Sequence, residues 1–193
     1  MDIDSIKDFA RASLKENIIT MAIMCLIILL SIICIALASI KYYYLLVLYF
    51  FIPAPLIMGL VKSSMKIVRN EDITVGTILE GFKGFHRVIL AGIITNFYVL
   101  LWSLLFIFPG MIARYSYSMT FYLLADNPNM TTFEAIRSSK SIMKEHRMDL
   151  VFLETSFTWW MLFGILTAGI GLLWVIPYYQ TAIATLYDHI RRD

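Results

Sequence analysis

The side chain in this sequence that could most readily take part in chemistry is Glu154, an acid in a long apolar run that begins at Leu150. An acidic group at membrane depth is normally paired, protonated or functional, and a proton relay is one such function. Arg147 precedes Glu154 by seven residues, so on a helix the two lie on nearly the same face. A structural pair, or a carboxylate that leans back to the interface, is the favoured interpretation, and a transport role is the alternative.

Two further polar side chains stand in apolar segments. Arg114 has Tyr115 and Tyr117 close by, and a long cationic side chain beside tyrosines is typical of anchoring at a membrane interface. Asn96 lies near the middle of another apolar run, where an amide commonly forms a hydrogen bond to a neighbouring helix. With Glu154, these residues form the predicted intramembrane polar site.

Lys and Arg recur at helical spacing in two segments. Steps of three and four residues put the cations of each segment on one helix face, which predicts contact with anionic lipid headgroups. Beside the second stripe Ile136, Met143 and Leu150 repeat every seven residues, so we expect that helix to lie flat on a membrane, with a protein docking site as the alternative. The predicted headgroup contacts are Lys62, Lys66, Arg69, Arg137, Lys140, Lys144 and Arg147.

The sequence lacks the patterns by which common enzymes and metal proteins are identified. His86, His146 and His189 stand on separate segments, without the spacing of four residues that helical zinc ligands use. A lipid-modifying enzyme would need a nucleophile with a base, and Ser156 near Glu154 is too weak a pairing to indicate one. We predict a protein that is not an enzyme, with no catalytic residue, no metal site and no cofactor.

The composition indicates which solvent surrounds these residues. Hydrophobic residues make up 60% of the chain and charged residues 16%, far from the usual composition of soluble domains. The formal net charge of +2 gives no reason to expect a nucleic-acid partner. We therefore expect an all-α integral membrane protein in which residues 1–193 form a single polytopic domain.

Six apolar segments are predicted to cross the membrane as three helical hairpins with tight outer turns. Their approximate bounds are 18–40, 42–61, 88–108, 111–125, 150–168 and 171–187. Pro53 and Pro55 stand inside the second segment, where proline removes backbone donors and imposes a kink. Turn residues separate the later segments at Pro109–Gly110 and at Gly169–Gly171. Segment 111–125 is short and contains Arg114, so a four-span alternative leaves it at the interface.

Amphipathic helices are expected on the cytoplasmic side, at about 2–16, 62–69, 77–87 and 131–148. Thr131 and Glu134 have the spacing of a capping box, so a helix should begin there and run towards Asp149. In this arrangement every Lys and Arg except Lys41 and Arg114 lies on one side of the membrane. The positive-inside rule then places both termini in the cytoplasm of a multi-pass cell-membrane protein.

Much of the chain resembles a family of small bacterial polytopic membrane proteins known as domain of unknown function nine-seventy-five. The residues and motifs on which this resemblance is based are Pro55, Leu56, Gly59, Gly81, Phe82, LWSLLFIFPG at 101–110, YSM at 117–119, LADNP at 124–128, Glu134, Ala135, Ile136, Ser139, Met143, His146, Ser156, Phe157 and GIGLLWVIPY at 169–178. Glu145 and Trp159 replace glycines that are usual in the family. The resemblance implies an integral membrane protein of bacterial type and transfers no substrate, cofactor or catalytic residue.

Two functional hypotheses follow. The first is a noncatalytic membrane protein that contacts anionic lipids and acts as a scaffold or as the partner of another membrane protein or of a second copy. The second is a small-solute or proton-coupled transporter subunit, in which the kinked second span, Asn96 and Glu154 surround a polar path. Glu154 separates the two hypotheses, because only the second requires its carboxyl group to take part in a flux.

Overall fold

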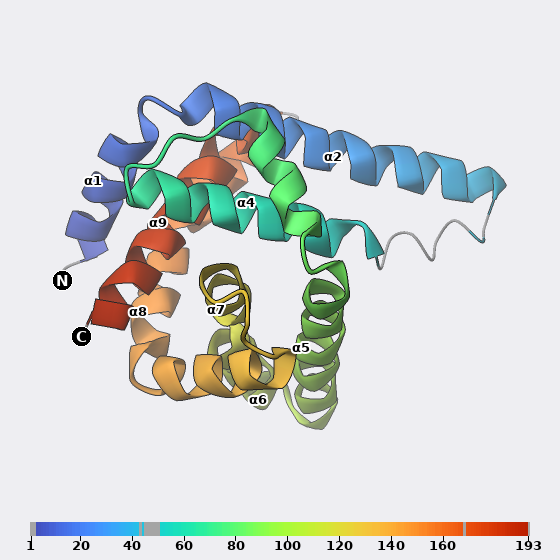
Figure 1. Ribbon diagram of the computed structural model, residues 1–193, viewed down its shortest axis with the longest axis vertical. Helices are drawn as coiled ribbons and strands as arrows, with labels where there is room; N and C mark the ends of the chain where they lie inside the picture. Colours follow the sequence, from blue (N-terminus) through green and yellow to red (C-terminus); the bar gives the residue numbers. More distant parts are fainter. Residues whose placement is uncertain (1–2, 43, 45–50, 168, 193) are drawn as a thin grey trace.

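The computed structural model describes residues 3–42, 44, 51–167 and 169–192, and the regular secondary structure in this part of the chain is entirely helical (Figure 1). The expected all-helical fold is confirmed. The elements are α1 (Ile3–Leu14), α2 (Ile18–Lys41), α4 (Pro53–Val68), the 3-10 helix η2 (Val75–Phe82), α5 (Phe85–Leu105), α6 (Ile107–Tyr117), α7 (Thr120–Asp126), α8 (Thr132–Leu166) and α9 (Leu172–Arg192).

Within the described residues, three helices are long enough and apolar enough to cross a membrane. They are α2, α5 and α8. Helix α2 spans Ile18–Lys41 and extends away from the rest of the molecule (Figure 1). The predicted arrangement of six spans in three hairpins is not supported, because the other predicted spans are short, broken or continuous with neighbouring segments.

The predicted kink of a second span at Pro53 and Pro55 stays a prediction. Both residues lie in the first turn of α4, where the missing amide hydrogen of proline costs no helical hydrogen bond. Much of the predicted segment 42–61 lies outside the described residues. Helix α4 then continues through the predicted amphipathic segment 62–69 until Asn70 ends it with a left-handed φ of 57°.

Helices α5 and α6 are separated at Phe106, which has an extended backbone. The predicted turn at Pro109–Gly110 is therefore three residues too late, and Pro109 instead lies inside α6, near its start. Gly110 packs against Ser103 of α5 so closely that any side chain at position 110 would overlap it. The small size of Gly110 thus allows the two helices to pack together.

The predicted span 111–125 is not one continuous helix. It is divided by a turn at Ser118–Met119, which separates α6 from α7. The backbone amide of Ser118 donates to the carbonyl of Tyr115 at 3.5 Å. Two short helices replace the single crossing that apolar length alone predicted.

Helix α8 begins at the predicted capping box. The Thr131 amide and hydroxyl both donate to the Glu134 carboxylate, at 2.8 and 2.7 Å, and the Glu134 amide donates back to the Thr131 hydroxyl. The helix then runs through Asp149 to Leu166, so the predicted separation of an interfacial helix 131–148 from a span at 150–168 is wrong. No proline or glycine occurs between Thr132 and Phe163 to end it.

Although α8 is continuous, it bends around α6. The Ser139 hydroxyl donates to the Ser116 carbonyl at 2.9 Å, and Glu154 bonds to Arg114 and Tyr115. Ser139 and Glu154 are about four helical turns apart, yet their partners lie within one turn of α6. Figure 1 shows the basic half and the apolar half of α8 running in different directions.

The turn between α8 and α9 is at the predicted position. Gly169 has a φ of 86°, a conformation that favours glycine, and Gly171 lies directly against Gly164. Helix α9 then begins at Leu172 and packs along α8, α4 and α1. The chain ends therefore lie close together, as Figure 1 shows.

The core lies where α1, α4, α7, α8 and α9 meet. Ile6 and Ala10 of α1 are buried in it, so the apolar face of the first helix packs on protein. The closest backbone approach is between α4 and η2, where a Cβ atom on Gly59 would overlap Ile78 and one on Gly81 would overlap Pro55. Segment 77–87, predicted as one helix, is η2 followed by a turn and the start of α5.

Candidate functional site

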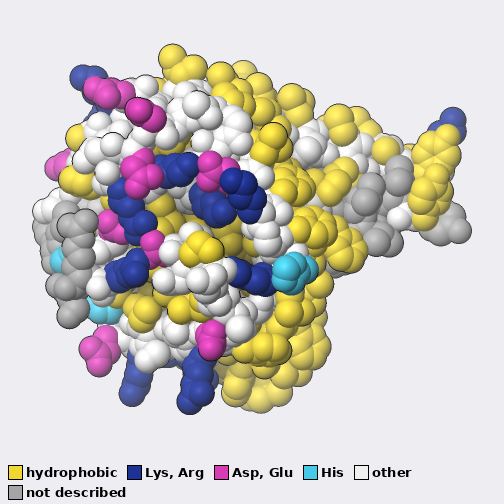
Figure 2. Space-filling view, viewed as in Figure 1, with side chains coloured by type: hydrophobic (Ala, Val, Ile, Leu, Met, Phe, Trp, Pro, Cys, Tyr) yellow, Lys and Arg dark blue, Asp and Glu magenta, His cyan; other side chains and the backbone are white. Residues whose placement is uncertain are grey.

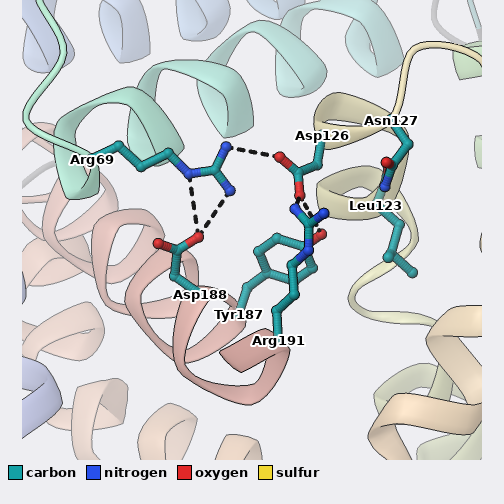
Figure 3. A network of polar contacts seen from close by, with 7 residues as sticks. All are labelled: Arg69, Leu123, Asp126, Asn127, Tyr187, Asp188 and Arg191. Carbon is teal, nitrogen blue, oxygen red and sulfur yellow. Dashed lines mark hydrogen bonds and ion pairs between the residues drawn. The ribbon is translucent and has the colours of Figure 1, made fainter. Parts of the chain in front are cut away.

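A network of ion pairs joins the C-terminal end of α4 to α7 and α9 (Figure 3). Arg69 binds Asp126 at 2.8 Å and Asp188 at 2.9 Å. Asp126 also forms an ion pair with Arg191 and accepts a hydrogen bond from the Tyr187 hydroxyl. One carboxylate on a short helix is thus held by two longer helices.

The two carboxylates of this network are nearly buried, whereas the arginines reach solvent. The side chain of Asp126 is 7% exposed and that of Asp188 is 11% exposed, against 30% for Arg69 and 48% for Arg191. Burial of a carboxylate is unfavourable unless it is paired, and these pairs meet that requirement. Arg69, a predicted headgroup contact, therefore pairs with carboxylates of its own chain. Its contact with lipid stays a prediction.

A second polar cluster surrounds Glu154. Its carboxylate accepts hydrogen bonds from Arg114 at 3.1 and 3.3 Å, from the Tyr115 hydroxyl at 3.1 Å and from the Tyr179 hydroxyl at 2.7 Å. The three donors come from α6 and α9, while Glu154 belongs to α8. The expected structural pairing of Glu154 thus exists, but the partner is Arg114 and not Arg147.

This cluster corrects the predicted membrane arrangement. The sequence interpretation put Arg114 just beyond an outer turn and Glu154 near the inner interface. A distance of 3.1 Å between their side chains means that Arg114 and Glu154 do not lie near opposite faces of a membrane. The arrangement was wrong because it treated each apolar segment as a straight crossing, whereas α8 bends around α6.

Asn96 does not join this cluster. Its side-chain amide donates to the Gly92 carbonyl of its own helix at 2.7 Å, and no described contact links it to Glu154. The side chain of Asn96 was predicted to bond to a neighbouring helix, whereas the structure shows it bonded to its own helix. Of the predicted polar site, the structure brings Arg114 and Glu154 together and leaves Asn96 apart.

The first basic stripe is anchored to η2 through Glu80. Lys66 forms an ion pair with the Glu80 carboxylate at 3.0 Å, and Lys62 donates to the Glu80 carbonyl at 2.9 Å. The hydrogen bond from Lys66 lowers the pKa of Glu80 below its usual value of 4.5. Burial lowers the pKa of Lys62, although the charge of Glu80 acts in the opposite direction.

The second basic stripe has a different environment. Arg137, Lys140 and Lys144 are exposed, and Arg147 is half-buried. Among the described residues, none of these four cations has an ion-pair or hydrogen-bond partner, and the Nε atom of Arg147 is buried without one. This contrasts with Lys66, whose charge is matched by Glu80.

Two grooves lie beside this second stripe, between α6 and α8. The larger has a volume of about 390 Å³ and is lined by Phe108, Met111, Ile112, Tyr115, Lys144, Glu145, Arg147, Met148 and Val151. The smaller has a volume of about 260 Å³ and is lined by Trp102, Pro109, Ile112, Ala113, Ser116, Tyr117, Lys140 and Arg147. Ile112 and Arg147 line both, so the grooves are adjacent.

Sequence reasoning singled out the cations and Glu154 but missed two features. It assigned no role to the side chain of Asp126 or to that of Asp188. Both are acids close to apolar segments, the same signal that drew attention to Glu154. The described residues hold no group of three or more His, Cys, Asp and Glu side chains arranged to bind a metal ion.

The comparisons with known proteins concern the C-terminal part of the chain. Residues 105–193 match the family model described as a protein of unknown function, DUF975, which confirms the resemblance over this range. No curated protein and no solved structure matches the chain. The matched range contains α6 to α9, and with them the Glu154 cluster and most of the groove lining. Residues 105–193 of this chain are therefore similar to the DUF975 family, a domain of unknown function.

Proposed function

We propose that this protein is a noncatalytic integral membrane protein that holds its unpaired basic stripe against anionic phospholipids of the cytoplasmic leaflet. In this role it serves as a lipid-contacting scaffold, and it presents the same face to a membrane partner or to a second copy. The stripe consists of Arg137, Lys140, Lys144 and Arg147 on the first half of α8. Cations near an anionic membrane surface each contribute about 1 kcal/mol of attraction.

The observation that carries this proposal is the division of the surface into an apolar and a charged part. Large side chains such as Ile40, Phe108 and Trp159 are 82%, 80% and 71% exposed. Figure 2 shows hydrophobic side chains covering the side formed by α2 and α5, and charged side chains gathered over the rest of the visible face. Contiguous apolar surface of this extent is typical of contact with lipid.

The pairing of the cations supports the choice of the second stripe. Lys66, Arg69 and Arg114 form ion pairs with carboxylates of the same chain. Cations without such partners, on a helix that also exposes Met148 and Phe152, have both a charged and an apolar surface available to a membrane.

The position of the termini supports the proposed orientation. Helix α1 packs against α9, and the Tyr178 hydroxyl donates to the Lys7 carbonyl at 3.3 Å. Both ends of the described chain therefore lie on one side of the molecule. With the positive-inside rule, this favours a multi-pass protein whose two termini are cytoplasmic.

Energy transfer from the tryptophans to dansyl-labelled lipids tests the lipid contact. We expect the purified protein, reconstituted in vesicles, to transfer more energy to dansyl-phosphatidylglycerol than to dansyl-phosphatidylcholine. The quadruple variant R137Q/K140Q/K144Q/R147Q should lose this preference, while K7Q/R11Q/K15Q, which neutralises cations of α1 and the following turn, should keep most of it. Equal transfer to both lipids by the unaltered protein would refute the proposal.

The transporter hypothesis is tested at Glu154. Because this carboxylate accepts four hydrogen bonds, it is well suited to holding α6, α8 and α9 together. If proteoliposomes carrying the protein show a proton or solute flux that E154Q abolishes, with folding intact, the scaffold proposal must give way to transport.

A further inference from the structure

We propose that the two grooves between α6 and α8 bind one anionic diacyl phospholipid, with its phosphate on Arg147 and one acyl chain in each groove. This inference rests on the proposed lipid contact and narrows it from a charged surface to a single site. The two grooves meet at Ile112 and Arg147, which line both of them.

The charges of the site fit a phosphate group. Lys144 lines the larger groove, Lys140 lines the smaller, and Arg147 lines both. Glu145 also lines the larger groove, so three cations stand against one carboxylate. A guanidinium group binds phosphate through two parallel hydrogen bonds, and the guanidinium of Arg147 is not used by any described residue.

The walls of the site fit hydrocarbon. Phe108, Met111 and Val151 line the larger groove, and Trp102 and Pro109 line the smaller. Phe108, Met111 and Trp102 are all exposed large apolar side chains, which an acyl chain would cover. A free phosphate would use the cations alone and would leave this apolar surface in contact with its surroundings.

The arrangement of the two grooves points to a lipid with two chains. Ile112 belongs to the lining of both grooves, so it marks the place where the two grooves meet. Arg147 lies at the same junction, where the glycerol phosphate of a diacyl lipid connects its chains. Volumes of about 390 and 260 Å³ hold only part of each chain, so the chain ends extend into the bilayer.

Native mass spectrometry of the protein in mild detergent tests the site, with dioleoyl phosphatidylglycerol as the probe. We expect one lipid to remain bound per chain and R147Q to weaken binding about tenfold, as expected for losing a hydrogen bond to a charged group. R137Q is the matched control, because Arg137 belongs to the same stripe but lines neither groove. It should change the affinity by less than about twofold.

A second variant tests the apolar part of the site. Ile112 is 51% exposed, so I112W should fold normally while its larger side chain fills the junction of the grooves. We expect I112W to lose phosphatidylglycerol binding although every cation is retained. Thermal unfolding of each variant provides the check on folding.

Three outcomes would overturn the inference. Equal losses in R137Q and R147Q would mean that the stripe attracts lipid only through its overall charge. Unchanged binding by I112W would exclude the grooves, and displacement of the lipid by an equal concentration of glycerol phosphate would show a site for free phosphate. Each of these results is compatible with a preference for anionic lipid in the energy-transfer experiment, so the failure of the site and of the proposed function are distinguishable.

Discussion

Asp126 illustrates how a single side chain determines the contact between three helices. It is the last residue of α7, and its carboxylate is bound by Arg69 of α4 and by Arg191 and Tyr187 of α9. Removing one partner of a buried ion pair leaves the other charge without compensation, which costs more than the pair itself contributes. The cost at Asp126 is moderated because its arginines reach solvent.

We predict that D126N lowers the free energy of unfolding by about 2 kcal/mol, since both arginines lose their shared carboxylate. Thermal unfolding in detergent, followed by circular dichroism, measures the change. D149N is the matched control, because Asp149 is 50% exposed and, among the described residues, pairs only with His146. It should cost less than about 0.5 kcal/mol, and a similar loss in both variants would contradict the prediction.

Glu80 makes the stability of the fold dependent on pH. Its pKa in the folded protein is lowered by the hydrogen bond from Lys66, so its stabilising contribution is present above pH 4.5 and is lost as the pH falls through the folded pKa. We therefore expect the unfolding temperature to fall on acidification below about pH 4.5, and to fall less in E80Q.

The Lys66 partner gives the control for this pH effect. K66Q removes the same hydrogen bond, so it should weaken the acid dependence to a similar extent as E80Q, and the double variant should resemble either single one. If K66Q keeps the full acid dependence, the pair does not cause it.

Single residues were partly predictable from the sequence. An acid in an apolar run is normally paired, protonated or functional, which drew attention to Glu154, but the sequence does not indicate which of several cations is its partner. Arg147 is close along the helix, yet Arg114 is the partner because α6 packs into the bend of α8. Asp126 was missed for a similar reason, since its partners lie far away in the sequence.

At the scale of elements, the contact between α4 and η2 depends on two glycines. The backbones approach so closely at Gly59 and Gly81 that a methyl group on either would overlap a carbonyl group of the other segment. Pro55, Gly59 and Gly81 are also among the residues on which the expected family resemblance was based, and they lie outside the matched range 105–193.

We predict that G81A lowers the free energy of unfolding by about 3 kcal/mol, because the backbone of α4 or η2 must move to accept the methyl group. Gly76 lies in the same 3-10 helix, where an added Cβ meets only the Thr74 hydroxyl at 3.6 Å. G76A should therefore change stability by less than about 1 kcal/mol. Chemical or thermal unfolding of both variants makes the comparison.

The elements themselves were predictable where the signal is local. The capping box at Thr131 and the glycine turn at Gly169 depend on neighbouring residues, and both are present. The position of the prolines was less predictable, because a proline at the start of a helix has the same sequence context as one that kinks it. The bend of α8 depends on its packing against α6, which no local pattern records.

At the scale of the whole molecule, the packing of α1 on α9 brings the two ends of the chain together. This requires an even number of crossings if both ends lie on the same side of a membrane. The sequence predicted six crossings, one for each apolar segment, whereas the described residues contain three helices that are long and apolar enough to cross a membrane. The length of an apolar segment does not give the number of spans when the segment folds into short helices such as α6 and α7.

Cysteine labelling of intact and permeabilised cells tests the orientation. Cys34 is exposed and Cys25 is buried, so single cysteines should be introduced in a C34S background. We expect K140C and D4C to react with a membrane-impermeant maleimide only after permeabilisation, because both belong to the proposed cytoplasmic side. Labelling of K140C in intact cells would reverse the proposed orientation.

The environments of the two groups of charges lead to opposite responses to sodium chloride. In the Asp126 network two arginines balance two nearly buried carboxylates, and mobile ions have little access to them. The cations on the exposed face of α8 lie in water, where interactions weaken over about 8 Å at physiological ionic strength. Concentrated electrolyte should therefore release bound anionic headgroups from the protein while its helices stay packed.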